Sequence, residues 1–138
     1  MLLSETAIPP SRSYGEPAGY DLYAPENTTI QPRGKQQVKT GIALKPPPGT
    51  YARVVSRSGF CWKKHTGIEG GVIDADYRGE IIIIMFNFSD DLIVINAGDK
   101  IAQFVLEKYV SVPMKQVESF VPTERGSKGF GSSDKKNN

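Results

Sequence analysis

Glycine and proline divide this chain at short intervals, and that spacing limits what it can fold into. The 138 residues include 14 glycines and 10 prolines, with short runs of β-branched and aromatic residues between them. Such runs fit pleated strands better than helices, and glycine and proline favour tight turns. The clearest runs are 37–44, 51–56, 81–88 and 92–95, and the clearest turns are 32–35, 46–50, 89–91 and 96–100. The pattern predicts one all-β domain, because a chain of this length can bury a single core.

The segment 101–110, IAQFVLEKYV, is ambiguous. Its apolar residues recur at a helical spacing, as Ile101, Phe104 and Val105 illustrate. They fit a strand equally well, with Phe104 on one face and Val105 and Tyr109 on the other. We expect a strand, because the chain that precedes this segment reads as a series of strands and turns.

The composition excludes several classes of protein. A formal net charge of +2 argues against a general nucleic-acid binder. Cys61 and His65 are the only cysteine and histidine, which excludes an internal disulfide and a His/Cys zinc site and favours a reducing compartment. The N-terminus does not resemble a secretory signal, and the longest apolar run, 81–86, is too short to span a bilayer. We therefore expect an intracellular protein, cytoplasmic or nuclear, that does not bind membranes.

Charged residues stand directly before the most hydrophobic segment. The stretch 71–80, GVIDADYRGE, carries two aspartates, an arginine and a glutamate, and the apolar run 81–86 follows it. A buried strand needs no such charge at its start. The stretch is either a simple hairpin turn or a functional loop, and these residues alone leave both interpretations open.

Three further polar clusters also have ordinary explanations. Asp21 lies in the alternating stretch AGYDLYA, where an inward carboxylate is costly and an acid at a turn edge facing water is the commoner outcome. Arg57 in SRSG, beside the flexible Gly59, fits an anion contact but also an ordinary turn. Gln103 in GDKIAQF fits a strand glutamine that faces solvent.

The chain from Thr123 onward is polar and glycine-rich, which is typical of a disordered end. One large apolar residue, Phe130, interrupts it. The alternative is a closing flap, in which Arg125 holds a terminal phosphate and Phe130 stacks on a base. The glycines would let backbone N–H groups approach an anion. It is not a Walker A loop, because no Lys-Ser or Lys-Thr follows a glycine at the required spacing.

Taken together and in this order, the stretches resemble the five motifs of the trimeric deoxyuridine triphosphatases (dUTPases). They are AGYDLYA (18–24), SRSG (56–59), GVIDADYRGE (71–80), GDKIAQF (98–104) and RGSKGFGSS (125–133). The resemblance implies a jelly-roll-like β-barrel over residues 1–122 and a flexible C-terminal arm over 123–138. It also implies a homotrimer with active sites shared between subunits. The implied reaction hydrolyses dUTP to dUMP and pyrophosphate, which lowers dUTP and supplies dUMP for dTMP synthesis.

The resemblance also assigns catalytic roles. Asp74 would activate the water that attacks the α-phosphorus. Asp21 would support the network of metal and water or orient Arg125. Mg²⁺ is the expected cofactor, bound mainly through substrate phosphates and water rather than directly by protein ligands.

Further positions match the residues that bind substrate. Tyr77 would pack under the deoxyribose and exclude a 2′-hydroxyl. Main-chain groups would read uracil, and the residues concerned are Gly71, Val72, Ile73 and Ile82. Phosphate contacts would come from Arg57, Ser58, Gly59 and Gln103. In the arm, Arg125 would hold the γ-phosphate, and Phe130, followed by Gly131, would cover the base. Asp76, Arg78 and Glu80 would hold the hairpin and trimer contacts.

Three positions depart from the family pattern, and two other functions compete. Lys128 stands where the family often has glycine, Ser56 replaces a proline, and Phe60 replaces a smaller aliphatic residue. The related dCTP deaminases share the fold but need a glutamate near the pyrimidine, for which Glu69 is the local candidate. A non-enzymatic nucleotide-binding regulator is the other alternative.

Overall fold

The computed structural model describes residues 1–13 and 15–129, and they form nine short strands and one helix. The strands are β1 (Tyr20–Tyr23), β2 (Thr28–Ile30), β3 (Lys35–Lys39), β4 (Thr50–Val55), β5 (Thr66–Glu69), β6 (Val72–Ile73), β7 (Ile82–Asn87), β8 (Ile93–Ile95) and β9 (Lys100–Lys108). The helix α1 spans Ser58–Lys64, between β4 and β5. The predicted all-β, jelly-roll-like fold is confirmed.

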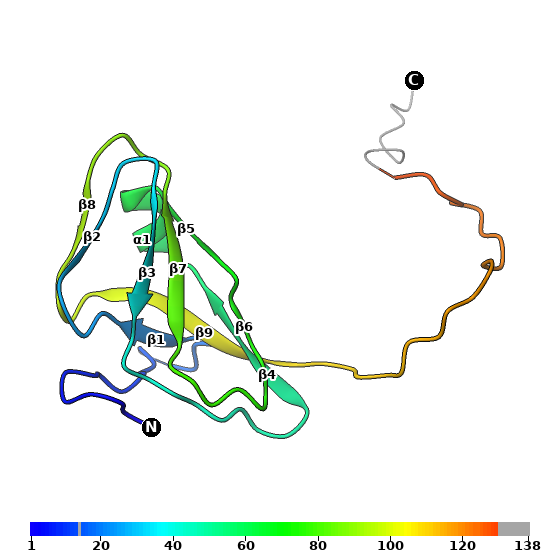
Figure 1. Ribbon diagram of the computed structural model, residues 1–138, viewed down its shortest axis with the longest axis horizontal. Coiled ribbons are helices and arrows are strands. Elements are labelled where there is room, and N and C mark those ends of the chain that lie inside the picture. Colours follow the sequence, from blue (N-terminus) through cyan, green and yellow to red (C-terminus); the bar gives the residue numbers. More distant parts are fainter. Residues whose placement is uncertain (14, 130–138) are drawn as a thin grey trace.

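The strands form three antiparallel sheets that enclose one core (Figure 1). Their strand orders are β1-β9-β4-β6, β2-β8 and β3-β7-β5. Strands adjacent in space are mostly distant in sequence, since β9 pairs with β1 and β4, and β7 pairs with β3 and β5. Such long-range pairing places motifs from distant parts of the chain on a common sheet.

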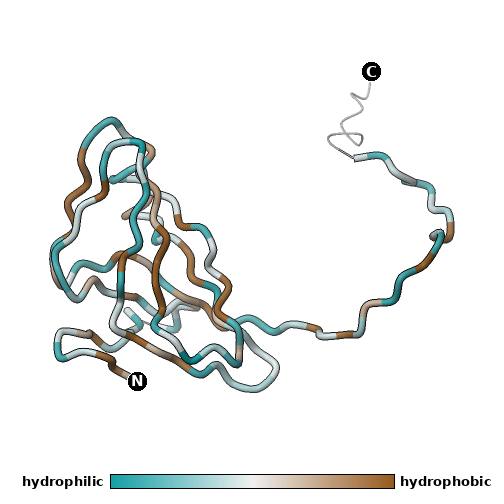
Figure 2. The backbone as a smooth tube through the Cα atoms, viewed as in Figure 1, coloured by the Kyte–Doolittle hydropathy of each residue, from teal (hydrophilic) through white to brown (hydrophobic). Residues whose placement is uncertain are grey.

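The core consists of aliphatic side chains from the inner faces of the sheets. Along β7 the inward residues Ile83, Met85 and Asn87 alternate with the more exposed Ile82, Ile84 and Phe86. Figure 2 shows the hydrophobic residues gathered along the strands. The buried apolar residues are Ala7, Leu22, Ala24, Ile30, Val38, Ile42, Ala43, Ala52, Val54, Ile81, Ile83, Met85, Ile93, Ile95, Ile101, Ala102 and Phe104.

The strand predicted over 37–44 is wrong in its second half, because β3 ends at Lys39. The buried Thr40 turns its hydroxyl to the backbone, donating to Ile81 O at 2.7 Å and accepting from Ile42 N at 3.2 Å. Gly41 then has a φ of +67°, which an extended strand cannot accommodate. The side chain of Thr40 and the left-handed Gly41 therefore end the strand.

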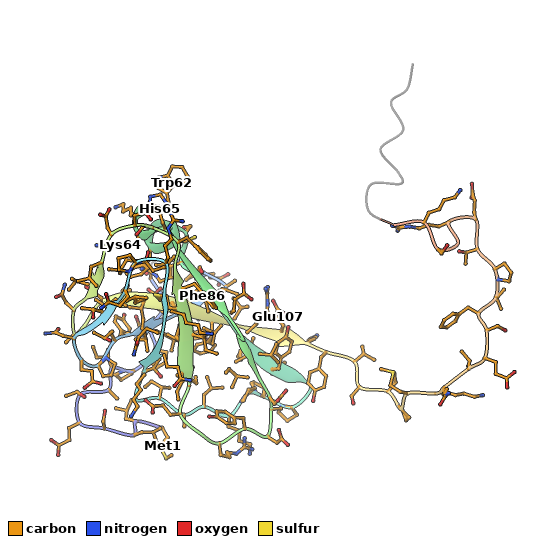
Figure 3. The ribbon with its side chains drawn as sticks, turned by 45° about the horizontal axis from the view of Figure 1, so that its top comes forward. Met1, Trp62, Lys64, His65, Phe86 and Glu107 are labelled. Carbon is orange, nitrogen blue, oxygen red and sulfur yellow. The ribbon has the colours of Figure 1, made fainter. Side chains whose placement is uncertain are left out.

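Helix α1 replaces the turn that we considered for SRSG. It has only seven residues, and none of them is buried, so the sequence contained no apolar stripe that could have predicted it. It ends at His65, whose φ of 51° is a left-handed cap. Figure 3 shows Trp62, Lys64 and His65 together at one end of the body.

The segment 101–110 forms a strand over most of its length, as predicted, since β9 continues to Lys108. Beyond it the chain leads away from the sheets as an extended exposed segment (Figure 1). Phe130 and Gly131 lie outside the described residues, and the division between body and arm at residue 122 stays a prediction. Within the described residues, no helix has the length and apolar character that crossing a membrane requires.

Candidate active site

The stretch 71–80 does not form the hairpin that the resemblance implied but connects two sheets, because β6 and β7 do not pair with each other. Strand β6 pairs with β4 through Ile73 and Ala52, whereas β7 pairs with β3 and β5. Strand β6 is therefore an edge strand. Strand β5 pairs with β7 only as far as Ile84, so the start of β7 at Ile82 has strand pairing on one side alone.

Charged residues of this loop hold it in place. The Arg78 guanidinium donates to Ala75 O at 2.9 Å and to Tyr77 O at 2.8 Å. The Glu80 carboxylate accepts from Gly41 N at 2.8 Å, which ties the loop to the segment after β3. The predicted role of holding this stretch is confirmed for Arg78 and Glu80, whereas for Asp76, and for the trimer contacts of all three, it stays a prediction.

A pocket of about 150 Å³ opens between the diverging strands. Its lining includes the predicted substrate residues Val72, Ile73, Tyr77 and Ile82, together with Asp74 and Glu80. The Tyr77 hydroxyl donates to Glu80 O at 3.0 Å, so the ring is held at the pocket wall. Gly71 adjoins β4 so closely that an added Cβ would lie 2.1 Å from Val54 O. Four of the predicted nucleoside contacts, Val72, Ile73, Tyr77 and Ile82, therefore line one pocket.

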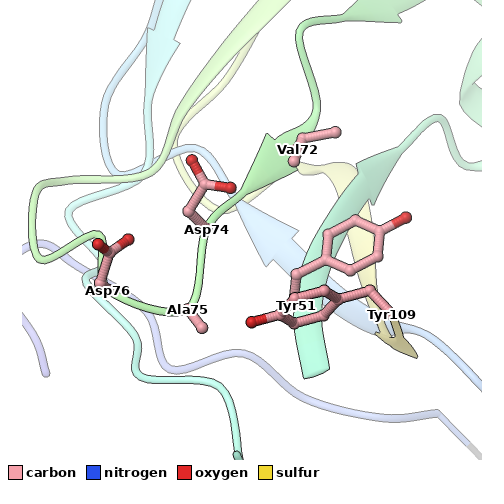
Figure 4. Close-up of a pocket in the computed structure, with 6 residues that line it drawn as sticks. All are labelled: Tyr51, Val72, Asp74, Ala75, Asp76 and Tyr109. Atoms are coloured by element: carbon pink, nitrogen blue, oxygen red, sulfur yellow. The ribbon is translucent and has the colours of Figure 1, made fainter. Parts of the chain in front are cut away.

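Asp74 also borders a larger pocket of about 500 Å³, shown in Figure 4. Tyr51 and Tyr109 form its opposite wall, with ring centroids 6.3 Å apart and planes at 78°. The Tyr51 hydroxyl donates to Glu107 Oε2 at 2.6 Å, and Arg53 Nη2 lies 2.6 Å from Glu107 Oε1. Hydrogen bonds from Arg53 and Tyr51 lower the pKa of Glu107. The sequence did not suggest Tyr51, Glu107 or Tyr109 as site residues, because only the β4–β9 register brings them together.

A second cluster, on β1, β9 and the start of α1, contains the predicted phosphate-binding residues. Asp21 is only 6% exposed, which excludes the acid facing water that we considered. Its Oδ1 accepts from Arg57 Nε at 2.7 Å, and its Oδ2 lies 2.8 Å from Lys100 Nζ. Burial alone would raise the pKa of Asp21, but the hydrogen bonds and charges of Lys100 and Arg57 outweigh it and lower the pKa.

Gln103 lies directly opposite Asp21 in the β1–β9 register. Its Nε2 donates to Ser56 O at 3.2 Å, just before Arg57. The adjoining cavity, of about 410 Å³, is lined by three cations and one acid among other residues: Arg57, Phe60, Lys64, Val94, Asn96, Asp99 and Lys100. This excess of positive charge suits an anionic ligand.

The structure does not bring Asp74 and Arg57 together within one chain. Ile73 pairs with Ala52, so Asp74 continues opposite Tyr51 at one end of β4, whereas Arg57 follows the other end. At about 3.3 Å per residue this separation is roughly 20 Å. One copy therefore has the pocket between β6 and β7 and the cationic cluster at opposite ends of β4.

Arg125 lies in a tight turn of the exposed segment and lines none of the three pockets described above. Its Nε donates to Lys128 O at 3.0 Å, and Lys128 N donates to Arg125 O at 3.2 Å. Gly126, with a φ of +56°, makes this turn possible. Figure 1 shows the turn far from the sheets along the chain's departing path.

The described residues contain no group of three His, Cys, Asp or Glu side chains that could enclose a metal ion. Asp74 and Asp76 line one pocket, so a divalent ion there would have single carboxylates beside it together with substrate oxygens and water. This donor set fits Mg²⁺, which keeps several waters and takes few protein ligands.

Comparisons with known proteins agree with this geometry. A dUTPase family profile matches residues 5–134. The deoxyuridine 5'-triphosphate nucleotidohydrolase of Solanum lycopersicum is 45% identical over 130 residues, which cover 94% of this chain and 77% of that protein. The dUTPase of Staphylococcus bacteriophage 80alpha with dUpNHpp matches with a TM-score of 0.84 and 34% identity, covering 96% of this chain and 95% of the phage chain.

A further solved structure carries a metal. A mutant dUTPase from phage phi11 of S. aureus, solved with a structural Mg(II) ion, matches with a TM-score of 0.80 and 33% identity, covering 87% of this chain and 95% of the phage chain. Sequence and structure therefore agree along nearly the whole chain, and the chain belongs to the dUTPase family.

Proposed function

We propose that this chain is a dUTP diphosphatase, which hydrolyses dUTP to dUMP and pyrophosphate. The observation that carries the proposal is the gap between β6 and β7, whose pocket is lined by Asp74, Tyr77 and residues of both strands. A flat pyrimidine can pair with strand backbone there as a neighbouring strand would. The names of the relatives, all deoxyuridine triphosphate nucleotidohydrolases, support the same activity.

Discrimination for deoxyuridine would come from this backbone and from Tyr77. Cytosine reverses the donor and acceptor pattern of uracil at its N3 and C4 positions, so backbone groups of Ile73 and Ile82 would lose partners. A buried site that leaves polar groups unpaired rejects an analogue strongly. Tyr77, fixed by its bond to Glu80 O, would pack under the sugar and leave no space for a 2′-hydroxyl.

Asp74 would be the general base for the attacking water. A carboxylate is a weak base, so most of the rate must come from positioning and from charge stabilisation. Water would attack the α-phosphorus, pyrophosphate would leave, and the water's proton would pass to the Asp74 carboxylate. Mg²⁺ on the triphosphate would neutralise its negative charge when bound.

Arg57 would hold the phosphates with Ser58, Gly59 and Gln103. Asp21 is more suited to anchoring Arg57 than to binding a metal, since both carboxylate oxygens already face cations at 2.7 and 2.8 Å. From the arm, Arg125 would reach the γ-phosphate and Phe130 the base. Because the arm leads away from its own body, it would close a site on another copy.

Two observations support a homotrimer with shared sites. Asp74 and Arg57 are too far apart in one chain to act on one triphosphate. In addition, the outer face of β7 presents Ile82, Ile84 and Phe86 where a solvent-facing strand would carry polar residues. Phe88, 57% exposed and stacked on Phe86, extends this apolar face. A second copy would cover it.

Mixing two inactive variants tests the shared site. Asp74→Asn and Arg57→Met should each abolish turnover, but mixed oligomers refolded from equal amounts should recover activity in about a quarter of their sites, because each site takes the two residues from different copies. Each variant refolded alone is the control. No recovery after mixing, with mixed oligomers present, would contradict a site shared between copies.

Two competing functions remain to be compared in the same assay. A deaminase would require Glu69 near the pyrimidine. Glu69 lies at the end of β5 opposite Ile84 and lines neither of the two pockets that Asp74 borders. Purified protein with Mg²⁺ should release pyrophosphate from dUTP in preference to dCTP, dTTP and UTP. Ammonia from dCTP would establish the deaminase instead, and absence of any turnover would favour a nucleotide-binding regulator. An intracellular location is part of this proposal, as nucleotide pools are intracellular.

A further inference from the structure

We infer that Lys100 is a positioning residue for the phosphate-binding Arg57, acting through the buried Asp21 that lies between them. This inference rests on the proposed phosphate-binding role of Arg57. Lys100 lies within the motif GDKIAQF, but the resemblance gave it no role.

A β-bulge brings Lys100 to this position. Along β9 the residues Ala102 and Phe104 point into the core, and Gln103 points out on the face that carries Asp21. Strict alternation would place Lys100 on the inner side with Ala102. Instead Ile101 is buried as well as Ala102, and the register shifts so that Tyr23 pairs with Lys100. The extra residue rotates Lys100 onto the outer face, as bulges beside functional sites commonly do.

The ammonium then occupies one side of the Asp21 carboxylate. Lys100 Nζ lies 2.8 Å from Oδ2, and Ser13 Oγ donates to the same oxygen at 3.3 Å. Arg57 is left with Oδ1, which it reaches through Nε at 2.7 Å. Without Lys100 the carboxylate would be open to the two parallel bonds that a guanidinium prefers. Lys100 therefore limits the contact between Arg57 and the Asp21 carboxylate to a single nitrogen, Nε.

The backbone of Lys100 fixes the rest of the guanidinium. Arg57 Nη1 donates to Lys100 O at 3.1 Å, which sets the plane of the group. Arg57 Nη2 forms no hydrogen bond to any of the described residues, so it is available for a phosphate oxygen. One carboxylate between two cations also leaves the cluster with a net charge of +1, whereas Asp21 and Arg57 alone would be neutral.

The test compares two lysines that line the same cavity. Lys100→Met removes the bulge lysine, and Lys64→Met removes an equal charge from a residue that, among the described residues, forms no hydrogen bond or ion pair with Asp21 or Arg57. If Lys100 positions Arg57, Lys100→Met should lose about 10- to 100-fold in kcat, the cost of a misplaced contact. Lys64→Met should raise KM and leave kcat near the wild-type value. Lys45→Met is the control and should leave the rate unchanged, because Lys45 is exposed and lines neither the cationic cavity nor the pocket between β6 and β7.

Binding measured by calorimetry separates positioning from a general structural defect. Lys100→Met should bind dUpNHpp more weakly but dUMP with unchanged affinity, because only the longer phosphate chain uses Arg57 fully. Lys100→Arg should restore most of the kcat, since an arginine can occupy the same carboxylate oxygen. If the melting temperature of Lys100→Met is too low for the assay, Lys100→Gln provides a second variant with a neutral side chain.

Three results would overturn the inference: an unchanged kcat in Lys100→Met, an equal loss of kcat in Lys64→Met, or equal weakening of dUpNHpp and dUMP binding. The proposed function fails separately, if the wild-type chain leaves dUTP intact. A wild type that hydrolyses dUTP, beside a fully active Lys100→Met, would remove only the role of Lys100.

Discussion

Replacing Gly71 by alanine should damage both stability and the nucleoside pocket, because the glycine lies directly against the backbone of β4. A Cβ at this position would lie 2.1 Å from Val54 O and 3.1 Å from Val54 C. Ordinary contacts begin near 3.5 Å, so the two strands would have to separate by more than about 1 Å. Val54 N donates to Gly71 O at 2.8 Å, and that separation would break the bond.

The cost can be worked from these contacts. Overpacking against rigid backbone costs about 1–3 kcal/mol, and the lost hydrogen bond adds about 1 kcal/mol. We therefore expect Gly71→Ala to lower the free energy of unfolding by about 2–4 kcal/mol, a large share of a typical total of about 5–15 kcal/mol. The melting temperature should fall by on the order of 10 °C.

Urea and thermal unfolding at one fixed protein concentration would measure this, since oligomer stability depends on concentration. Gly59→Ala is the matched control: it has nothing within 4 Å of its added Cβ and lies in α1, where alanine is favoured over glycine. The folded Gly71→Ala protein should also bind dUMP more weakly, because β6 forms one wall of the pocket. A stability within about 0.5 kcal/mol of wild type would refute the packing argument.

Three further changes have defined outcomes. Asp74→Asn should retain binding of dUpNHpp, measured by calorimetry, while losing nearly all pyrophosphate release; retained turnover would remove Asp74 as the base. Deleting residues 125–138 should leave the melting temperature and oligomeric state unchanged but reduce kcat severely, and a truncated chain that fails to fold would make the arm structural. The pKa of Asp21 is lowered in the folded state, so its ion pairs stabilise the protein above the ordinary carboxyl pKa, and that stability is lost as the pH falls through the folded value below 3.8. The melting temperatures of wild type and Asp21→Asn, measured from pH 7 to pH 3, should therefore converge only at the acidic end.

The sequence predicted the strands well where their pattern was local. Segment 101–110 resembled a helix as much as a strand, and the surrounding turns were enough to identify β9. The strand end at Thr40 was missed because it depends on a hydroxyl that bonds to Ile81, which is distant in sequence. Helix α1 was missed because it buries none of its residues and so leaves no periodic signal.

The candidate site was only partly accessible to sequence reasoning. The motif comparison selected Asp21, Arg57 and Tyr77, and the structure places each of them in a described pocket or ion-pair cluster. It gave no role to Lys100. Strand alternation could not supply one either, because it places that side chain on the inner face unless the bulge at Ile101 is known. The loop 71–80 was mistaken for a hairpin because sequence gives the order of strands but not the sheet to which each belongs.

That misassigned loop explains why the pocket exists. In a hairpin, β6 and β7 would satisfy each other's backbone groups, and no donor or acceptor would remain for a base. Here β6 is the edge of one sheet, and β7 begins with pairing on one side, so both strands present main chain to the same gap. Exposed strand edges normally invite aggregation. In this fold the edge is short and lies beside the charged loop of Arg78 and Glu80, and a bound nucleotide would cover it. The feature that threatens solubility is thus also the one that we propose reads the base.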